Sequence, residues 1–178
     1  TGPCSDRQSD CSAVAGWLLQ RIGPVKVIEI GTSYGRQLPT FVPHASRVVC
    51  VDPMYDWVPD IREVHGFEPD RVSQAKLDTW RQNVEPWKEK VELVIGNSYH
   101  VHGDPAHSAS FAGASLLIID GCHHPADLVA KDYENFRRFM TSPHYVIWDD
   151  IGMPDVQGAA DRFPGPYKDL FGARLCFF

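Results

Sequence analysis

Residues 25–35 read Val25-Lys26-Val27-Ile28-Glu29-Ile30-Gly31-Thr32-Ser33-Tyr34-Gly35, and this sequence is the strongest indication of how the chain folds. Its first six residues are mostly apolar and do not alternate strictly, which is typical of a strand buried on both faces of a parallel sheet. Gly31 and Gly35 allow positive φ and let a ligand approach the backbone closely. The order therefore predicts a strand followed by a ligand-binding turn, and a plain strand-to-helix turn is the alternative.

Four more short apolar runs repeat the pattern of this strand, at residues 48–51, 91–95, 116–119 and 145–148. Residues with helical spacing lie between them, most clearly over 126–140, where Val129, Tyr133, Phe136 and Met140 form one stripe. Strands that alternate with helices predict an α/β fold. We expect a Rossmann-like three-layer sandwich with a mostly parallel central sheet and helices on both faces.

Length and composition exclude several classes of protein. The 178 residues predict a single domain over 1–178, with 43% hydrophobic and 22% charged residues, as in ordinary globular proteins. A net charge of −6 without a basic face argues against nucleic-acid binding, and no apolar stretch reaches the ~20 residues of a membrane span. Five irregularly spaced cysteines without a C-x-x-C motif argue against a disulfide framework or a zinc site. They predict a reducing, cytoplasmic location.

Polar residues follow the predicted strands, at the edge of an open α/β sheet where ligands bind. Asp52 ends the second strand, about 20 residues past the glycine turn, where a carboxylate can accept both hydroxyl hydrogens of a ribose. The alternative is that Asp52 caps the next turn. Asn97 and Ser98 follow the third strand and are candidates to bond an adenine edge, although Gly-Asn-Ser is also a common turn.

Three aspartates follow the fourth and fifth strands, namely Asp120, Asp149 and Asp150. Because neighbouring parallel strands lie about 4.8 Å apart, these carboxylates can converge on one point. Carboxylates brought together repel one another unless a proton or a cation intervenes. Oxygen ligands suit a hard cation such as Mg²⁺ or Ca²⁺, so the sequence predicts a metal site, with helix capping or solvent exposure as the alternative.

Two histidines, His123 and His124, lie three and four residues past Asp120. A histidine beside a metal-bound hydroxyl can act as a general base near neutral pH. We therefore expect one of them to be catalytic, with a structural role as the alternative.

Together these motifs resemble the class I S-adenosylmethionine-dependent methyltransferases, over about residues 13–152. The resemblance implies that Glu29, Gly31 and the turn through Gly35 hold the methionine part of the cofactor, with Thr32, Ser33 and Tyr34 in that turn. It implies that Asp52 binds the ribose, that Asn97 and Ser98 lie near the adenine, and that Asp120 borders the cofactor.

The segment Ile118-Ile119-Asp120-Gly121-Cys122-His123-His124 and the later Trp148-Asp149-Asp150 narrow the resemblance. They resemble the metal-dependent O-methyltransferases of the catechol type and the I-D-G-x-H branch found among antibiotic and sugar O-methyltransferases and cephalosporin hydroxylase-like proteins. In such enzymes the acidic residues after strands four and five bind Mg²⁺, and the base falls on His123, or on His124 after a one-residue shift. The family's sheet ends in an antiparallel hairpin, and with 28 residues after Asp150 we expect a shortened, incomplete one.

The sequence therefore predicts an enzyme that methylates a small hydroxylated acceptor with S-adenosylmethionine and Mg²⁺, without nucleic-acid or membrane partners. A homo-oligomer is left open. A metal-free enzyme of the same fold and a non-catalytic S-adenosylmethionine-binding domain are the alternatives. A dinucleotide-dependent oxidoreductase is disfavoured because the turn reads E-x-G-x-x-x-G and not G-x-G-x-x-G.

Overall fold

The computed structural model describes residues 10–56, 71–121 and 125–178. The helices and strands are, in chain order, α1 (Asp10–Ile22), β1 (Lys26–Ile30), α2 (Leu38–Phe41), η1 (Val42–His44), β2 (Arg47–Asp52), α3 (Gln74–Val84), η4 (Glu85–Trp87), β3 (Val91–Ile95), α4 (Ser98–Val101), α5 (Pro105–Phe111), β4 (Ala114–Ile119), α6 (Ala126–Phe136), η5 (Arg137–Phe139), β5 (Met140–Trp148), α7 (Pro154–Ala160), β6 (Tyr167–Leu170) and β7 (Ala173–Phe177).

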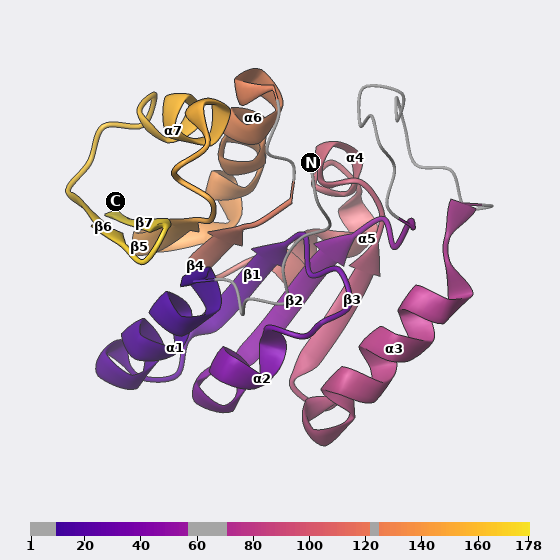
Figure 1. Ribbon diagram of the computed structural model, residues 1–178. Coiled ribbons are helices and arrows are strands. Elements are labelled where there is room, and N and C mark those ends of the chain that lie inside the picture. The colour runs from indigo at the N-terminus through magenta and orange to yellow at the C-terminus, as the bar shows by residue number, and fades with distance from the viewer. Residues whose placement is uncertain (1–9, 57–70, 122–124) are drawn as a thin grey trace.

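A seven-stranded sheet in the order β3-β2-β1-β4-β5-β7-β6 forms the middle layer (Figure 1). The first five strands pair in parallel, and β7 pairs antiparallel with both β5 and β6. The predicted mostly parallel, Rossmann-like sheet is therefore confirmed. The expectation of an incomplete hairpin is wrong, because β6 and β7 supply both of its strands within four and five residues.

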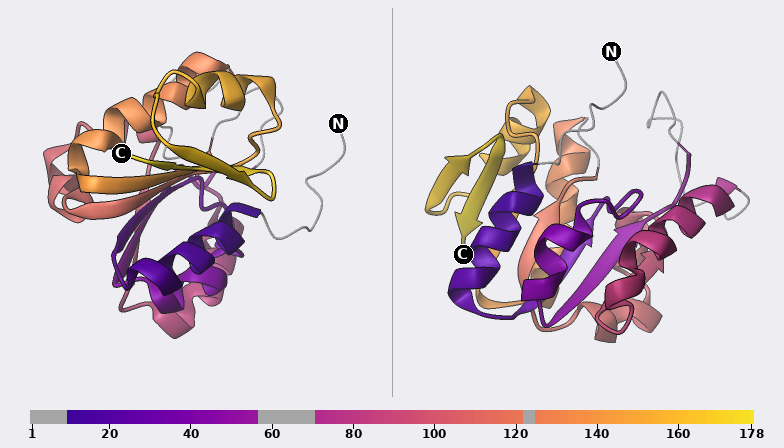
Figure 2. Two further views of the ribbon diagram at one scale, coloured as in Figure 1. Left: turned by 90° about the vertical axis from the view of Figure 1, so that its left-hand side faces the viewer. Right: turned by 60° about the horizontal axis from the view of Figure 1, so that its bottom comes forward.

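Two apolar cores hold helices against the two faces of the sheet. Residues of α1, α2 and α3 pack with one set of strand side chains, and residues of α4 to α7 pack with the other. The left view of Figure 2 shows α1 and α6 on opposite sides of the sheet. The near-continuous apolar runs in the strands follow from this, because both faces of each central strand are covered.

One helical detail differs from the sequence-based expectation. The stripe over 126–140 ends at Phe136, and Met140 begins β5 instead of closing the helix, although its side chain is partly buried against the same core. On α1, Trp17 is 43% exposed, and the Arg21 guanidinium lies 4.1 Å from the centre of its ring. No helix among the described residues is long and apolar enough to cross a membrane.

Candidate functional site

The turn after β1 is built as its glycines predict. Gly31 has φ +92° and Gly35 has φ +70°. A Cβ on Gly31 would lie 2.1 Å from the carbonyl oxygen of Asp120, so only glycine lets the turns after β1 and β4 pack this closely. The following helix, α2, has only four residues and carries Pro39 near its start.

Contacts from outside hold this turn in place. The Ser33 amide, in a residue with φ +49°, donates to Oδ2 of Asp52 at 2.8 Å. Trp80 of α3 donates its ring N–H to Oγ1 of Thr32 at 3.2 Å, and both side chains are buried. Tyr34 is 38% exposed at the tip of the turn. The helical spacing of Leu77, Trp80 and Val84 indicates that Trp80 is buried, but it gives no signal of this contact with Thr32.

Asp52 lies at the end of β2, where it is 5% exposed and already has several protein donors. Its Oδ1 accepts from the Met54 amide at 2.6 Å and from Nζ of Lys76 at 3.0 Å. Nζ of Lys76 also donates to the Tyr55 carbonyl at 3.1 Å. The carboxylate that sequence analysis assigned to a ribose is therefore fixed in place by α3 and by the adjacent turn.

Glu29 lies beneath the turn and is 1% exposed. Burial raises its pKa to about 7, an effect that the nearby Asp120 charge adds to and a hydrogen bond from Thr32 opposes. The Cys50 thiol donates to Oε2 of Glu29 at 3.4 Å. Glu29 thus supports the turn from the protein interior.

Asn97 and Ser98 make structural contacts at the start of α4. The Asn97 side chain caps α4 by accepting from the Tyr99 amide at 2.9 Å. The Ser98 hydroxyl donates to Oδ1 of the buried Asp132 in α6, at 2.7 Å. The bond of Ser98 joins the start of α4 to α6, and that of Asn97 is local. The adenine contact predicted for the pair stays a prediction.

The turns after β4 and β5 bring Asp120 and Asp149 together, and α1 adds a third group. The sulfur of Cys11 and one carboxylate oxygen of each aspartate all lie within 4.8 Å of one another. Asp149 is 5% exposed and Cys11 is fully buried. Asp150 is exposed, has φ +50° and does not belong to this group. The predicted histidines, His123 and His124, lie outside the described residues.

Gln37 joins two members of this group. Its amide nitrogen donates to Oδ2 of Asp120 at 2.8 Å, and its amide oxygen accepts from the Cys11 thiol at 3.3 Å. Gln37 precedes α2 but makes no capping bond with its side chain, which leaves the amide to reach across the site. Neither Cys11 nor Gln37 was predicted, because they come from segments about 110 and 83 residues before their partners.

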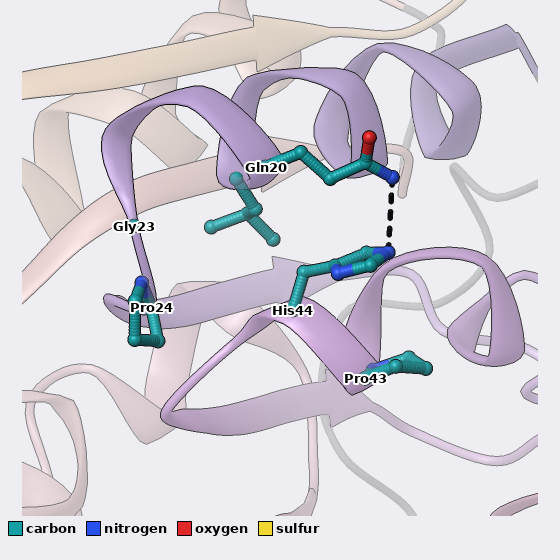
Figure 3. Close-up of a pocket in the computed structure, with 6 residues that line it drawn as sticks. Gln20, Gly23, Pro24, Pro43 and His44 are labelled. Atoms are coloured by element: carbon teal, nitrogen blue, oxygen red, sulfur yellow. Dashed lines mark hydrogen bonds between the residues drawn. The ribbon is translucent and has the colours of Figure 1, made fainter.

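One hollow of the described surface lies at the opposite end of the sheet, beside the end of α1. It has a volume of about 340 Å³ and lies between the end of α1 and η1. Nε2 of Gln20 and Nε2 of His44 are hydrogen-bonded there at 3.0 Å (Figure 3). A second hollow of about 290 Å³ lies beside Gly96, at the carboxyl end of β3. Among the described residues, the lining of neither hollow includes Asp120 or Asp149. The candidate site at the carboxyl edge therefore lies apart from the hollow beside Gln20 and His44.

Comparison of the whole chain with known proteins identifies the fold. No family model matches the sequence, and no curated protein does. Many solved structures are similar. An O-methyltransferase from Bacillus cereus, in complex with S-adenosylhomocysteine, has a TM-score of 0.69 at 16% identity, covering 98% of this chain and 83% of that one.

Two other similar structures are those of an O-methyltransferase and an N-methyltransferase, whose names give different acceptor atoms. The O-methyltransferase of tomaymycin synthesis from Streptomyces achromogenes has a TM-score of 0.63 at 10% identity, covering 94% of this chain and 78% of that one. An N-methyltransferase from Bradyrhizobium japonicum has a TM-score of 0.56 at 11% identity, covering 94% and 95%. The chain has the class I methyltransferase fold, and this fold by itself does not select the acceptor atom.

Proposed function

From this fold we propose that the protein is an S-adenosylmethionine-dependent methyltransferase that methylates a hydroxyl group of a small molecule with the help of a divalent cation. The observation that carries the proposal is the convergence of the glycine turn, Asp52 and the Asp120–Asp149 pair at one edge of the sheet. In class I methyltransferase topology this is the edge where ligands of open α/β sheets bind.

The charges at this edge fit both ligands. Asp52, Asp120 and Asp149 gather there, with Lys76 paired to Asp52, and Glu29 adds a carboxyl group that is only partly ionised near neutral pH because its pKa is about 7. An acidic site favours a positively charged sulfonium and a divalent cation. Carboxylate oxygens from two neighbouring strands also supply the donor type that divalent cations take from proteins.

Each group has a defined task in the proposed reaction. When bound, S-adenosylmethionine supplies the methyl group, and a divalent cation supplies a Lewis acid that lowers the pKa of the acceptor hydroxyl. Asp52 holds the ribose, and the backbone of the turn after β1 orients the methionine part. Asp120 and Asp149 hold the cation, with Gln37 fixing the Asp120 carboxylate.

The proton of the acceptor hydroxyl goes to His123 or His124 in this proposal. Holding the acceptor oxygen in line with the methyl group supplies most of the rate enhancement, because the transfer needs little covalent help from the protein. The alternative of a metal-free or non-catalytic S-adenosylmethionine-binding domain makes different predictions and is tested by the same experiment.

The test combines calorimetric titration of S-adenosylmethionine and S-adenosylhomocysteine with methyl transfer to a panel of catechols and other hydroxylated acceptors. We expect both cofactors to bind, and chelation by EDTA to abolish transfer. Asp120→Asn and Asp149→Asn should each lower turnover by more than the roughly 10–100-fold that loss of an outer-shell partner costs. Asp78→Asn, on the exposed side of α3, is the control and should retain activity.

Three results would contradict parts of the proposal. Activity that survives both EDTA and the two aspartate substitutions would make the enzyme metal-free. Cofactor binding without transfer to any acceptor would make the domain non-catalytic. Absence of binding by either form of the cofactor would reject the proposal as a whole.

A further inference from the structure

Cys11 is placed at the candidate cation site by the geometry of α1. This helix precedes β1, runs back along the sheet for 13 residues, or about 20 Å, and so starts near the carboxyl edge. Cys11 lies in its first turn, is 0% exposed, and its sulfur lies within 4.8 Å of carboxylate oxygens of both Asp120 and Asp149. Three segments distant in sequence thus contribute three donor groups of two chemical types.

We infer that Cys11 is the third protein ligand of this cation site and that it makes the site selective for a divalent cation that accepts thiolate, such as Zn²⁺ or Co²⁺, over Mg²⁺. This inference rests on the cation site of the proposed function. It changes the expected ion, because the aspartates alone suit Mg²⁺.

The donor chemistry separates the two kinds of ion. Mg²⁺ takes oxygen ligands in near-octahedral geometry and usually keeps several waters. Thiolate ligands select softer ions than Mg²⁺. In a tetrahedral site of one sulfur and two oxygens, metal–sulfur distances of about 2.3 Å and metal–oxygen distances of about 2.1 Å place the donor atoms roughly 3.6 Å apart. The three donors here lie within 4.8 Å of one another, so shifts of about 1 Å at most bring them to that spacing.

Gln37 orients one ligand of such a site. Its amide nitrogen donates to Oδ2 of Asp120 at 2.8 Å, whereas its amide oxygen accepts from the neutral Cys11 thiol at 3.3 Å, a hydrogen bond that the thiolate gives up when it binds the cation. Ligating carboxylates are oriented by partners of this kind. Binding of the cation requires Cys11 to lose its proton, so affinity should rise with pH and binding should release protons.

A site of one cysteine and two aspartates lacks the paired cysteines by which zinc sites are identified in a sequence. Cys11 lies 109 residues before Asp120. The other described cysteines have different surroundings, since Cys50 lies against Glu29 and Cys176 lies on β7 in the opposite core. Cys176 is therefore a matched control for removal of a buried thiol.

The test uses the full chain, stripped of cations by a chelator and then titrated with Co²⁺, Zn²⁺ or Mg²⁺. In the wild type we expect a thiolate-to-cobalt charge-transfer absorption and tighter binding of Zn²⁺ than of Mg²⁺. Cys11→Ser should lose the absorption and weaken Zn²⁺ binding by more than about 100-fold, because outer-shell losses alone cost 10–100-fold. It should not weaken Mg²⁺ binding, since a hydroxyl replaces the thiol. Cys176→Ser should keep the absorption.

Circular dichroism checks that each variant is folded, and Cys11→Ala replaces Cys11→Ser if the serine disturbs the core. Equal Zn²⁺ affinity in wild type and Cys11→Ser would overturn the inference, as would a wild type that binds neither Co²⁺ nor Zn²⁺. If Asp120→Asn loses cations while Cys11→Ser keeps them unchanged, the inference fails and the proposed cation site stands. If binding of Zn²⁺ depends on Cys11 but no methyl transfer occurs, the inference stands and the proposed function fails.

Discussion

The ion pair between Lys76 and Asp52 offers the sharpest test of how the site is held together. The two side chains are 10% and 7% exposed, and Nζ lies 3.0 Å from Oδ1. Substitution of Lys76 by Met keeps most of the apolar part of the side chain and removes the ammonium group with its charge. It leaves Asp52 buried with two backbone amides, those of Ser33 and Met54, as its remaining described donors.

The cost should be large because a buried charge loses its counter-charge. Breaking a buried pair by removing one partner typically costs about 3–5 kcal/mol. For a chain of this size, 1 kcal/mol shifts the melting temperature by roughly 2–4 °C, so Lys76→Met should lower it by roughly 6–20 °C. Arg81→Met is the control on the same helix, because Arg81 pairs with Asp78 at 3.1 Å with both side chains more than half exposed. Exposed pairs typically contribute about 0–1 kcal/mol.

The assay is urea unfolding at pH 7 of the wild type, Lys76→Met, Asp52→Asn and the double variant. The double variant should be less destabilised than the sum of the single variants. The coupling energy is expected toward the upper end of the roughly 0.5–3 kcal/mol measured for residues in contact. If Lys76→Met costs no more than Arg81→Met, or if the two substitutions are additive, the pair does not hold Asp52 as we argue.

Two further predictions concern the turn after β1. Gly31→Ala would place a Cβ 2.1 Å from the Asp120 carbonyl oxygen at φ +92°. In chemical unfolding it should therefore cost about 2–3 kcal/mol more than Gly113→Ala, the control at φ +78°, where nothing lies within 4 Å of the added Cβ. Equal costs of the two substitutions would contradict close packing of the turns after β1 and β4. Burial raises the pKa of Glu29 from 4.5 to about 7, so the folded state binds the carboxyl proton more tightly than the unfolded state does. The stability that this tighter proton binding supplies is fully present below pH 4.5 and is lost as the pH rises through about 7. Relative to Glu29→Gln, the wild type should lose on the order of 3 kcal/mol of unfolding free energy across that range, and a constant difference would refute this role of burial.

Local patterns in the sequence were sufficient for most of the fold. A run of buried β-branched residues reports that both faces of a strand are covered, and this information needs no knowledge of the partners. The strand starting at Lys26 and the glycine turn after it were predicted for this reason. The end of the helix at Phe136 was not, because apolar spacing continues to Met140 and does not distinguish a helical turn from the first residue of a strand.

The hairpin was underestimated for a different reason. Chain length limits the number of residues after Asp150, but it does not set how many each strand needs. Two strands of four and five residues, joined across Phe171 and Gly172, fit within that length.

The sequence by itself determined which polar residues end the strands, and therefore that Asp52, Asp120 and Asp149 lie at one edge of the sheet. Only the tertiary structure decided which groups meet them there. Lys76 and Cys11 lie on α3 and α1, and Gln37 directly precedes α2. Their side chains reach the carboxylates because these three helices pack on one face of the sheet. Local periodicity indicates that a residue is buried, but it does not indicate which residue it contacts. The contacts of the acidic groups are therefore determined by how the helices pack on the sheet.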